Sequence, residues 1–203
     1  MPGRGRPRSF DRDDALLRAM HVFWARGYEG TSIDDLTTAM GITKPSLYAA
    51  FDCKEALFRE SIELYESLDG PHTTRNLDTG ATAREAVEAM LRGNAEAYVD
   101  PATPPGCMIV LSGLLGTSAN DDVRAFLEGK RLEHEARLRA RLDRGVSEGD
   151  LGPDADTASL AAFYSTVLNG LSIQARDGAS RATMHAVIDH AMAAWTSLAR
   201  AAD

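Results

Sequence analysis

The side chains best suited to contact a polyanion lie between residues 31 and 54, in the run TSIDDLTTAMGITKPSLYAAFDCK. Lys44 and Lys54 carry positive charge, and Ser46 and Tyr48 carry hydroxyl groups that can donate to phosphate oxygens. Ala49, beside them, can touch a thymine methyl group but cannot donate a hydrogen bond to a base edge. The run therefore indicates a DNA contact surface that depends more on phosphate positioning and DNA shape than on direct base readout.

The same run contains the signals for two short helices joined by a tight turn. Ser32 and Asp35 have capping-box spacing at the start of the first helix, and Gly41 supplies a left-handed residue at its end. Thr43 can cap the second helix, and Pro45 falls in its first turn, where a missing N–H group costs nothing. This arrangement is a helix-turn-helix, which places its second helix in the major groove. The hydroxyls of Ser32 and Thr43 are candidates for phosphate contact, with helix capping as the alternative role.

The chain resembles the DNA-binding domain of the TetR/AcrR family of transcriptional repressors over about residues 10–60. The matching residues are Phe23, Gly27-Tyr28, Thr31-Ser32-Ile33, Leu36, Gly41-Ile42-Thr43-Lys44, Ser46-Leu47-Tyr48, Phe51 and Lys54-Glu55-Ala56-Leu57-Phe58. The resemblance implies an all-α fold, in which a larger helical domain binds an effector and forms a homodimer. It also implies a repressor that a small molecule releases from a pseudo-palindromic operator in double-stranded DNA.

The charge distribution permits DNA binding despite a net charge of −8. Residues 1–60 contain nine Lys or Arg and nine Asp or Glu, so the whole excess of acid lies beyond them. Arg4, Arg6 and Arg8 precede the first acid, Asp11, in a stretch without apolar anchors, which predicts a disordered basic arm. Such an arm can follow the minor groove or the phosphates, and a solvated tail is the alternative.

The expected organisation is an arm over residues 1–9, a helix-turn-helix domain over 10–54, and a ligand-binding and dimerisation domain over 55–203. Apolar periodicity and caps predict further helices near residues 12–26, 54–68, 83–99, 106–116, 121–147, 157–176 and 181–201. Asp52 with Glu55 is expected to cap the helix from residue 54, and Asn120 the helix from residue 121.

We expect a mostly apolar effector cavity in the larger domain. Its candidate residues are Met90, Asn94, Tyr98, Met108, Leu111, Phe126, His134 and Phe163. Asn94 and His134 have an alternative role as internally hydrogen-bonded core groups.

The last two helices have apolar faces wider than one neighbour can cover. The resemblance implies that this hairpin pairs with its counterpart in a homodimer. The candidate interface residues are Val167, Gly170, Leu171, Ile188, Met192 and Trp195.

Other classes of function have little support in the sequence. There is no phosphate-binding glycine loop, nucleophile elbow or metal-ligand spacing, so we expect no catalysis, metal or cofactor. No apolar run is long enough for a membrane span, and Cys53 and Cys107 form no disulfide framework, which indicates a cytoplasmic protein. Two alternatives remain open. One is a helical interaction module that does not bind DNA, and the other is a redox switch at Cys53 beside Lys54.

Overall fold

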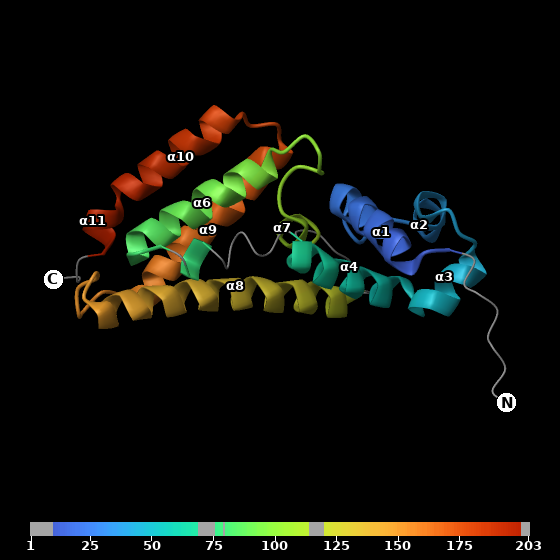
Figure 1. The fold of residues 1–203 in the computed structure, drawn as a ribbon, viewed down its shortest axis with the longest axis horizontal. Coiled ribbons are helices and arrows are strands. Elements are labelled where there is room, and N and C mark those ends of the chain that lie inside the picture. The colour runs from blue at the N-terminus through green and yellow to red at the C-terminus, as the bar shows by residue number, and fades with distance from the viewer. Residues whose placement is uncertain (1–9, 69–75, 79, 114–119, 200–203) are drawn as a thin grey trace.

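The computed structural model describes residues 10–68, 76–78, 80–113 and 120–199, and the regular elements in those ranges are all helices (Figure 1). They are α1 (Arg12–Arg26), α2 (Ile33–Met40), α3 (Lys44–Phe51), α4 (Lys54–Leu68), α6 (Ala83–Tyr98), α7 (Met108–Leu111), α8 (Asp121–Glu148), α9 (Thr157–Arg176), α10 (Arg181–Ala193) and α11 (Trp195–Leu198). The predicted all-α fold is confirmed. The predicted basic arm, with Arg4, Arg6 and Arg8, lies outside the described residues.

Local hydrogen bonds set the helix-turn-helix as the sequence predicts. The Asp35 N–H donates to the Ser32 hydroxyl at 3.1 Å, and the Ser32 N–H donates to the Asp35 carboxylate at 2.9 Å. Gly41 ends α2 in the left-handed conformation with φ +68°. The Ser46 N–H then donates to the Thr43 hydroxyl at 3.3 Å and caps α3. Each cap satisfies backbone groups that the helix itself leaves unpaired, so these residues fix where α2 and α3 begin and end.

Aromatic rings join α1 to α4. Phe23 meets Phe58 edge to face at 5.0 Å between ring centroids, and Trp24 meets Tyr65 in the same way at 4.9 Å. All four side chains are buried. Edge-to-face pairs of this kind contribute about 0.5–1.5 kcal/mol each beyond their buried area. α4 therefore packs into the N-terminal unit while it also leads into the larger one.

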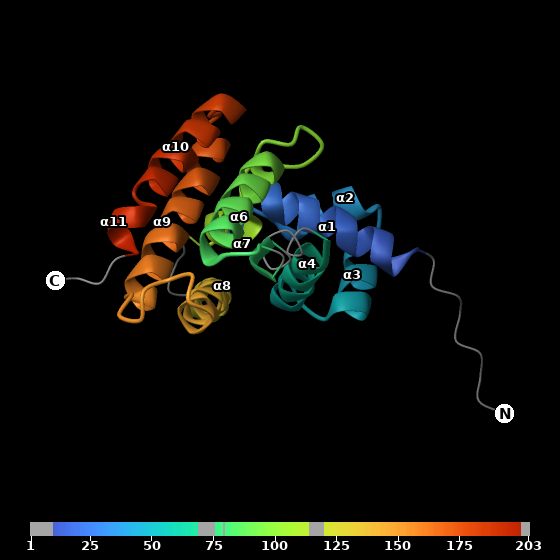
Figure 2. The same cartoon turned by 60° about the vertical axis from the view of Figure 1, so that its left-hand side comes forward.

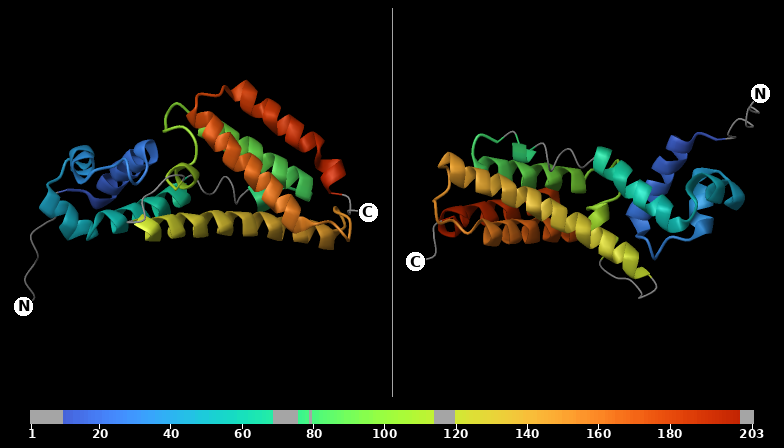
Figure 3. Two further views of the ribbon diagram at one scale, coloured as in Figure 1. Left: turned by 180° about the vertical axis from the view of Figure 1, so that it is seen from behind. Right: turned by 90° about the horizontal axis from the view of Figure 1, so that it is seen from below.

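The larger unit is a helical bundle at the opposite end of the molecule from α3. α9 packs against α8 and α6, and α10 packs against α6 and α9 (Figures 1 and 3). Figure 2 shows α9 and α10 side by side, at the end away from the helix-turn-helix. α4 and α7 lie between the two units, and α7 contacts α1, α4, α8 and α9.

Several helix ends differ from the sequence expectation. Asp52 does not cap α4, because it ends α3 with φ +66°, and the Ala56 N–H instead contacts the Cys53 sulfur at 3.4 Å. Asn120 makes no capping bond, because its side-chain amide donates to Glu29 in the N-terminal unit. A non-local partner has replaced the local cap in this case.

The apolar run from residue 106 forms only one turn of helix within its described part. Gly106 has φ +79°, and a Cβ there would lie 2.6 Å from the Ser172 carbonyl oxygen. Close backbone contact therefore keeps Gly106 in a positive-φ bend, and α7 begins only at Met108. The predicted last helix is also interrupted, since α10 ends at Ala193 and α11 begins at Trp195.

Candidate DNA-binding surface and ligand cavity

α3 presents an exposed surface at one end of the molecule. Thr43, Lys44, Pro45, Tyr48 and Ala49 are exposed, and Tyr48 retains 48% of its accessible surface. The opposite face of α3 is buried through Leu47 and Phe51, which are 0% and 2% exposed. Burial of that face against the N-terminal core orients the exposed residues outward as one group. This group has the polar composition and the helix placement that major-groove docking requires.

Lys44 is held by an acid from the first helix of the motif. Its Nζ lies 2.7 Å from the Asp34 carboxylate, and both side chains are exposed. The hydrogen bond and charge of Asp34 raise the pKa of Lys44, so the amine remains protonated. The same carboxylate neutralises it locally, so a DNA phosphate must compete with Asp34 for this amine.

Lys54 is less available than the sequence suggests. Its Nζ lies 4.2 Å from the centroid of the Tyr28 ring, and burial lowers the pKa of the amine. The Ser32 hydroxyl already has two partners. It donates to the Asp35 carboxylate, and it accepts from the Asp35 N–H to cap α2. The hydroxyls of Ser46 and Thr43 lie 2.9 Å apart and share a hydrogen bond. Capping, the alternative role considered for Ser32 and Thr43, is therefore present at both positions.

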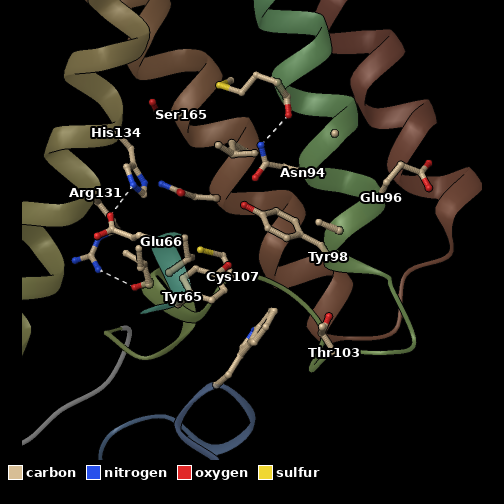
Figure 4. A pocket seen from close by; sticks show the side chains of 18 of the residues that line it. Tyr65, Glu66, Asn94, Glu96, Tyr98, Thr103, Cys107, Arg131, His134 and Ser165 are labelled. Carbon is tan, nitrogen blue, oxygen red and sulfur yellow. Dashed lines mark hydrogen bonds and ion pairs between the residues drawn. The ribbon is translucent and has the colours of Figure 1, made fainter. Parts of the chain in front are cut away.

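A cavity of about 720 Å³ lies among α1, α4, α6, α7, α8, α9 and the start of α10 (Figure 4). Its apolar and aromatic wall is formed by Trp24, Tyr65, Met90, Tyr98, Ile109, Val110, Leu132, Leu138 and Leu168. Its polar and charged groups include Glu66, Asn94, Glu96, Asp100, Thr103, Glu128, Arg131, Glu135, Ser165, Asn169 and Arg181. A volume of this size suits a small organic molecule. The cavity wall therefore contains more charged side chains than the mostly apolar cavity predicted from the sequence.

Half of the predicted ligand residues lie at this cavity. Met90, Asn94, Tyr98 and His134 line it, and Figure 4 shows Asn94 and His134 approaching it from opposite helices. The Asn94 side-chain amide donates to the Met90 carbonyl oxygen at 2.8 Å. The Asn94 side-chain amide therefore uses one N–H donor for a hydrogen bond within α6.

The other predicted ligand residues lie elsewhere. Met108 is fully buried in the core, and the half-buried Leu111 packs close to Gly106. The Phe126 ring lies between α8 and α4, with the Arg59 guanidinium 4.5 Å from its centroid. Phe163 is 37% exposed on the outer side of α9. Apolar periodicity identifies such residues as inward or outward but does not distinguish a cavity wall from a filled core.

Glu66 joins α4 to α8 at the edge of the cavity. Its carboxylate lies 3.3 Å from the His134 Nε2 and accepts from the Lys130 Nζ at 2.8 Å. The hydrogen bond from His134, followed by that from Lys130, lowers the pKa of Glu66 to about 2. The connecting helix and the longest helix of the cavity wall are thus held by a charged cluster.

Cys107 contributes a buried thiol to the cavity wall. Tyr65 and Tyr98 both hydrogen-bond to it, and its backbone N–H donates to the Ser172 hydroxyl at 2.8 Å. Burial raises the pKa of the Cys107 thiol, and burial also raises the pKa of Tyr98 well above its ordinary value. The thiol is therefore protonated at neutral pH and held by two phenol groups.

Trp24 lines the cavity, although it is not among the candidate ligand residues predicted from the sequence. Its indole N–H donates to the Gly106 carbonyl oxygen at 2.9 Å, so the N-terminal unit contacts the cavity wall directly. Tyr65, Ser165 and Asn169 also line the cavity and are likewise absent from the predicted ligand residues. No local signal separates these residues from core positions, because the cavity forms where helices distant in sequence meet.

The outer face of the α9–α10 hairpin differs from the predicted dimer interface. Leu171, Ile188, Met192 and Trp195 are buried within the protomer at 6% exposure or less, so they cannot form the surface that a partner covers. Val167 and Gly170 are half-buried, and a Cβ at Gly170 would meet no atom within 4 Å. The exposed large apolar side chains of these two helices are Phe163, Ile173 and Val187. The outer hairpin face consists of these three side chains together with Val167 and Gly170.

No helix in the described part of the chain is both long and apolar enough to cross a membrane. The described residues also contain no group of three His, Cys, Asp or Glu side chains placed to hold a metal ion.

A helix-turn-helix unit joined to an all-helical, cavity-bearing bundle defines a class of one-component regulators. Residues 15–61 match the family model described as bacterial regulatory proteins, tetR family. The HTH-type transcriptional repressor ComR of Escherichia coli K12 is 31% identical over 198 residues, which cover 97% of this chain and 94% of ComR. The chain belongs to the TetR family and is a DNA-binding transcriptional regulator.

Solved structures agree with this assignment. A cysteine mutant of the TetR family regulator CifR, complexed with a 26-base-pair operator DNA, is 47% identical with a TM-score of 0.92. The similarity covers 94% of this chain and 100% of that one. AibR, solved with isovaleryl coenzyme A and operator DNA, shares the fold at 18% identity, 89% and 95% coverage and a TM-score of 0.65.

Proposed function

We propose that this protein is a homodimeric repressor that binds a pseudo-palindromic operator and leaves it when a small molecule occupies the cavity. The observation that carries the proposal is the combination of an exposed α3 surface with a 720 Å³ cavity, connected by α4 and Trp24. CifR, a relative of nearly equal length, binds operator DNA as a TetR regulator, and ComR is named a repressor. A role on chromosomal DNA implies that the protein acts in the cytoplasm.

In the proposed mechanism, two copies of α3 enter successive major grooves, with Lys44, Ser46 and Tyr48 contacting phosphates. The effector shifts the protein to a state whose two α3 helices no longer match the half-site spacing. It does so only through a higher affinity for that state. The cavity favours a ligand with an apolar body, for the aromatic and aliphatic wall, and polar groups that reach Asn94 or Ser165.

The direct test is selection of bound DNA from a random-sequence pool by the purified protein, followed by a titration of the selected duplex. A two-fold symmetric site bound at nanomolar concentration in moderate salt supports the proposal. Recovery of unselected sequences, or of none, contradicts it. Compounds that raise the thermal midpoint of the free protein can then be tested for release of this duplex.

Tyr48→Ala tests the role of the recognition surface. Loss of the hydroxyl is expected to weaken binding roughly fivefold to tenfold on selected and unrelated duplexes alike, because a phosphate contact carries little sequence information. Fluorescence anisotropy with both duplexes measures this effect. Tyr48 is half-exposed, so the thermal midpoint should not change. Equal operator affinity of the variant and the parent would remove Tyr48 from the interface.

A further inference from the structure

A second cleft, of about 400 Å³, lies along α8 and shares no lining residue with the effector cavity. Arg137, Arg141 and Arg144 line it together with Leu77, Asp78 and Ala140. The three arginines are spaced i, i+4 and i+7 on one helix, so they project from the same face. Ala140, between them, leaves the space that a larger side chain would fill.

Arg141 is the unusual member of this set. Its side chain is only 2% exposed, and its Nη2 donates to the Gly80 carbonyl oxygen at 3.2 Å. Within the described residues, its Nε and Nη1 have no hydrogen-bond partner. Buried polar groups are nearly always satisfied by protein, water or an ion, and an unsatisfied one costs about 1–3 kcal/mol. A buried guanidinium with two unused donors therefore indicates a missing acceptor.

The carboxylates around Arg141 do not supply that acceptor. Glu148 and Asp150 lie 3.8 and 3.9 Å from its Nη1 and Nη2, beyond hydrogen-bonding distance. Asp150 accepts the Ala83 N–H at 2.6 Å, and Glu148 pairs with Arg144 at 3.4 Å. The lining residues include three arginines and one acid, Asp78, while Glu148 and Asp150 lie beside Arg141 without hydrogen-bonding to it.

We propose that this cleft binds a phosphate-type oxyanion, either free phosphate or the phosphoryl group of a small metabolite. Guanidinium groups match such oxyanions in charge and in the geometry of paired N–H donors. The cleft lies on the C-terminal half of α8, at the end of the molecule away from α3, so operator phosphates do not reach it (Figure 1). The anion would connect α8 with residues 76–78, which precede α6. This site is independent of the effector cavity and of the operator function proposed above.

Calorimetric titration of the full chain with inorganic phosphate tests this site, with sodium chloride added to keep ionic strength constant. We expect one site per chain with a Kd at or below about 1 mM, and a thermal midpoint that rises roughly 3–5 °C at ten times that concentration. Arg137→Gln and Arg144→Gln should each weaken phosphate binding roughly tenfold, because each removes a charge-assisted hydrogen bond. Arg141→Lys keeps the charge, removes the planar fork, and should also weaken binding.

Arg139→Gln is the matched control, since Arg139 lies on the same helix but outside the cleft and pairs with Asp143 at 3.9 Å. It should leave the phosphate Kd unchanged. The proposal is overturned if the parent protein binds no phosphate at 10 mM. It is also overturned if Arg139→Gln weakens binding as much as Arg137→Gln, or if acetate binds as well as phosphate. Adenosine monophosphate, titrated in parallel, distinguishes the two sources, because tighter binding than phosphate identifies a phosphorylated metabolite.

Discussion

At the scale of single residues, we expect the Asp34–Lys44 pair to set how strongly α3 attracts DNA of any sequence. Asp34→Asn removes the negative charge 2.7 Å from the Lys44 amine, so that the amine is free to pair with a DNA phosphate. Non-specific affinity should rise roughly fivefold, and the salt dependence of binding should steepen by about one counterion. Anisotropy titrations of an unrelated duplex from low to moderate salt measure both effects.

Asp189→Asn is the matched control for that prediction. Asp189 also makes an exposed ion pair, with Arg92 at 2.6 Å, but it lies on α10, far from α3. Asp189→Asn makes the same change in net charge as Asp34→Asn, but it should leave the DNA affinity nearly constant. If both variants bind the unrelated duplex equally well, the effect reflects total charge and Asp34 has no special role.

The two cysteines should differ in reactivity for physical reasons. Cys53 is exposed, whereas Cys107 is buried with a raised thiol pKa and two tyrosine partners. A disulfide reagent at pH 8 should modify one thiol per native chain quickly, because Cys53 is exposed while burial protects Cys107 and raises the pKa of its thiol. In Cys53→Ser the remaining thiol should react at least about tenfold more slowly, and unfolding in urea should remove the difference. Fast labelling of native Cys53→Ser would mean that the cavity wall opens readily.

At the scale of helices, the Glu66 cluster holds α4 to α8. Glu66→Gln is expected to lower the free energy of unfolding by about 1 kcal/mol at pH 7, since the group is partly solvent-screened. The folded-state pKa of about 2 lies below the ordinary value of 4.5, so the carboxylate stabilises the fold above about pH 4.5. That stabilisation decreases as the pH falls toward 2.

Urea unfolding of parent and Glu66→Gln at pH 7 and at pH 3 measures this difference. The difference in unfolding free energy between the two proteins should be smaller at pH 3. Glu63→Gln makes the same chemical change on an exposed position of α4 and should behave like the parent. A gap that does not depend on pH would assign the effect of Glu66→Gln to packing and not to its charge.

The helix-turn-helix could be predicted in detail because its determinants are local. Ser32, Gly41 and Thr43 each act within four residues of their own position, so the local sequence contains the whole signal. The cavity could not be predicted in this way, because its contacts are distant in sequence. The Trp24 indole N–H, for example, donates to the Gly106 carbonyl oxygen 82 positions away. Asn120 failed as a cap for the same reason, since its partner is Glu29 in another unit. Apolar spacing predicts which helices pack but not which gaps between them remain open.

At the scale of the whole molecule, we expect the outer hairpin face to be the surface that pairs two protomers, so that two α3 helices can read one operator. The predicted interface residues were chosen from apolar stripes, and apolar side chains occur on both the buried and the exposed sides of the α9–α10 hairpin. Burial separates them, because Leu171 and Ile188 fill the protomer while Phe163, Ile173 and Val187 remain exposed. A two-fold operator requires two protomers at a fixed spacing, so loss of this face should abolish operator binding without unfolding the protomer.

Gly170→Glu tests that face with little risk to the fold. A Cβ at Gly170 meets no atom within 4 Å in the protomer, and replacing a helical glycine stabilises a helix by up to about 1 kcal/mol. The variant should stay helical and become monomeric by light scattering, since it places a charge in the apolar interface, and its operator affinity should fall at least about 100-fold. Gly129→Glu makes the same change at an equally open glycine of α8 and should remain dimeric and active. A dimeric Gly170→Glu protein with unchanged operator affinity would place the interface elsewhere on the molecule.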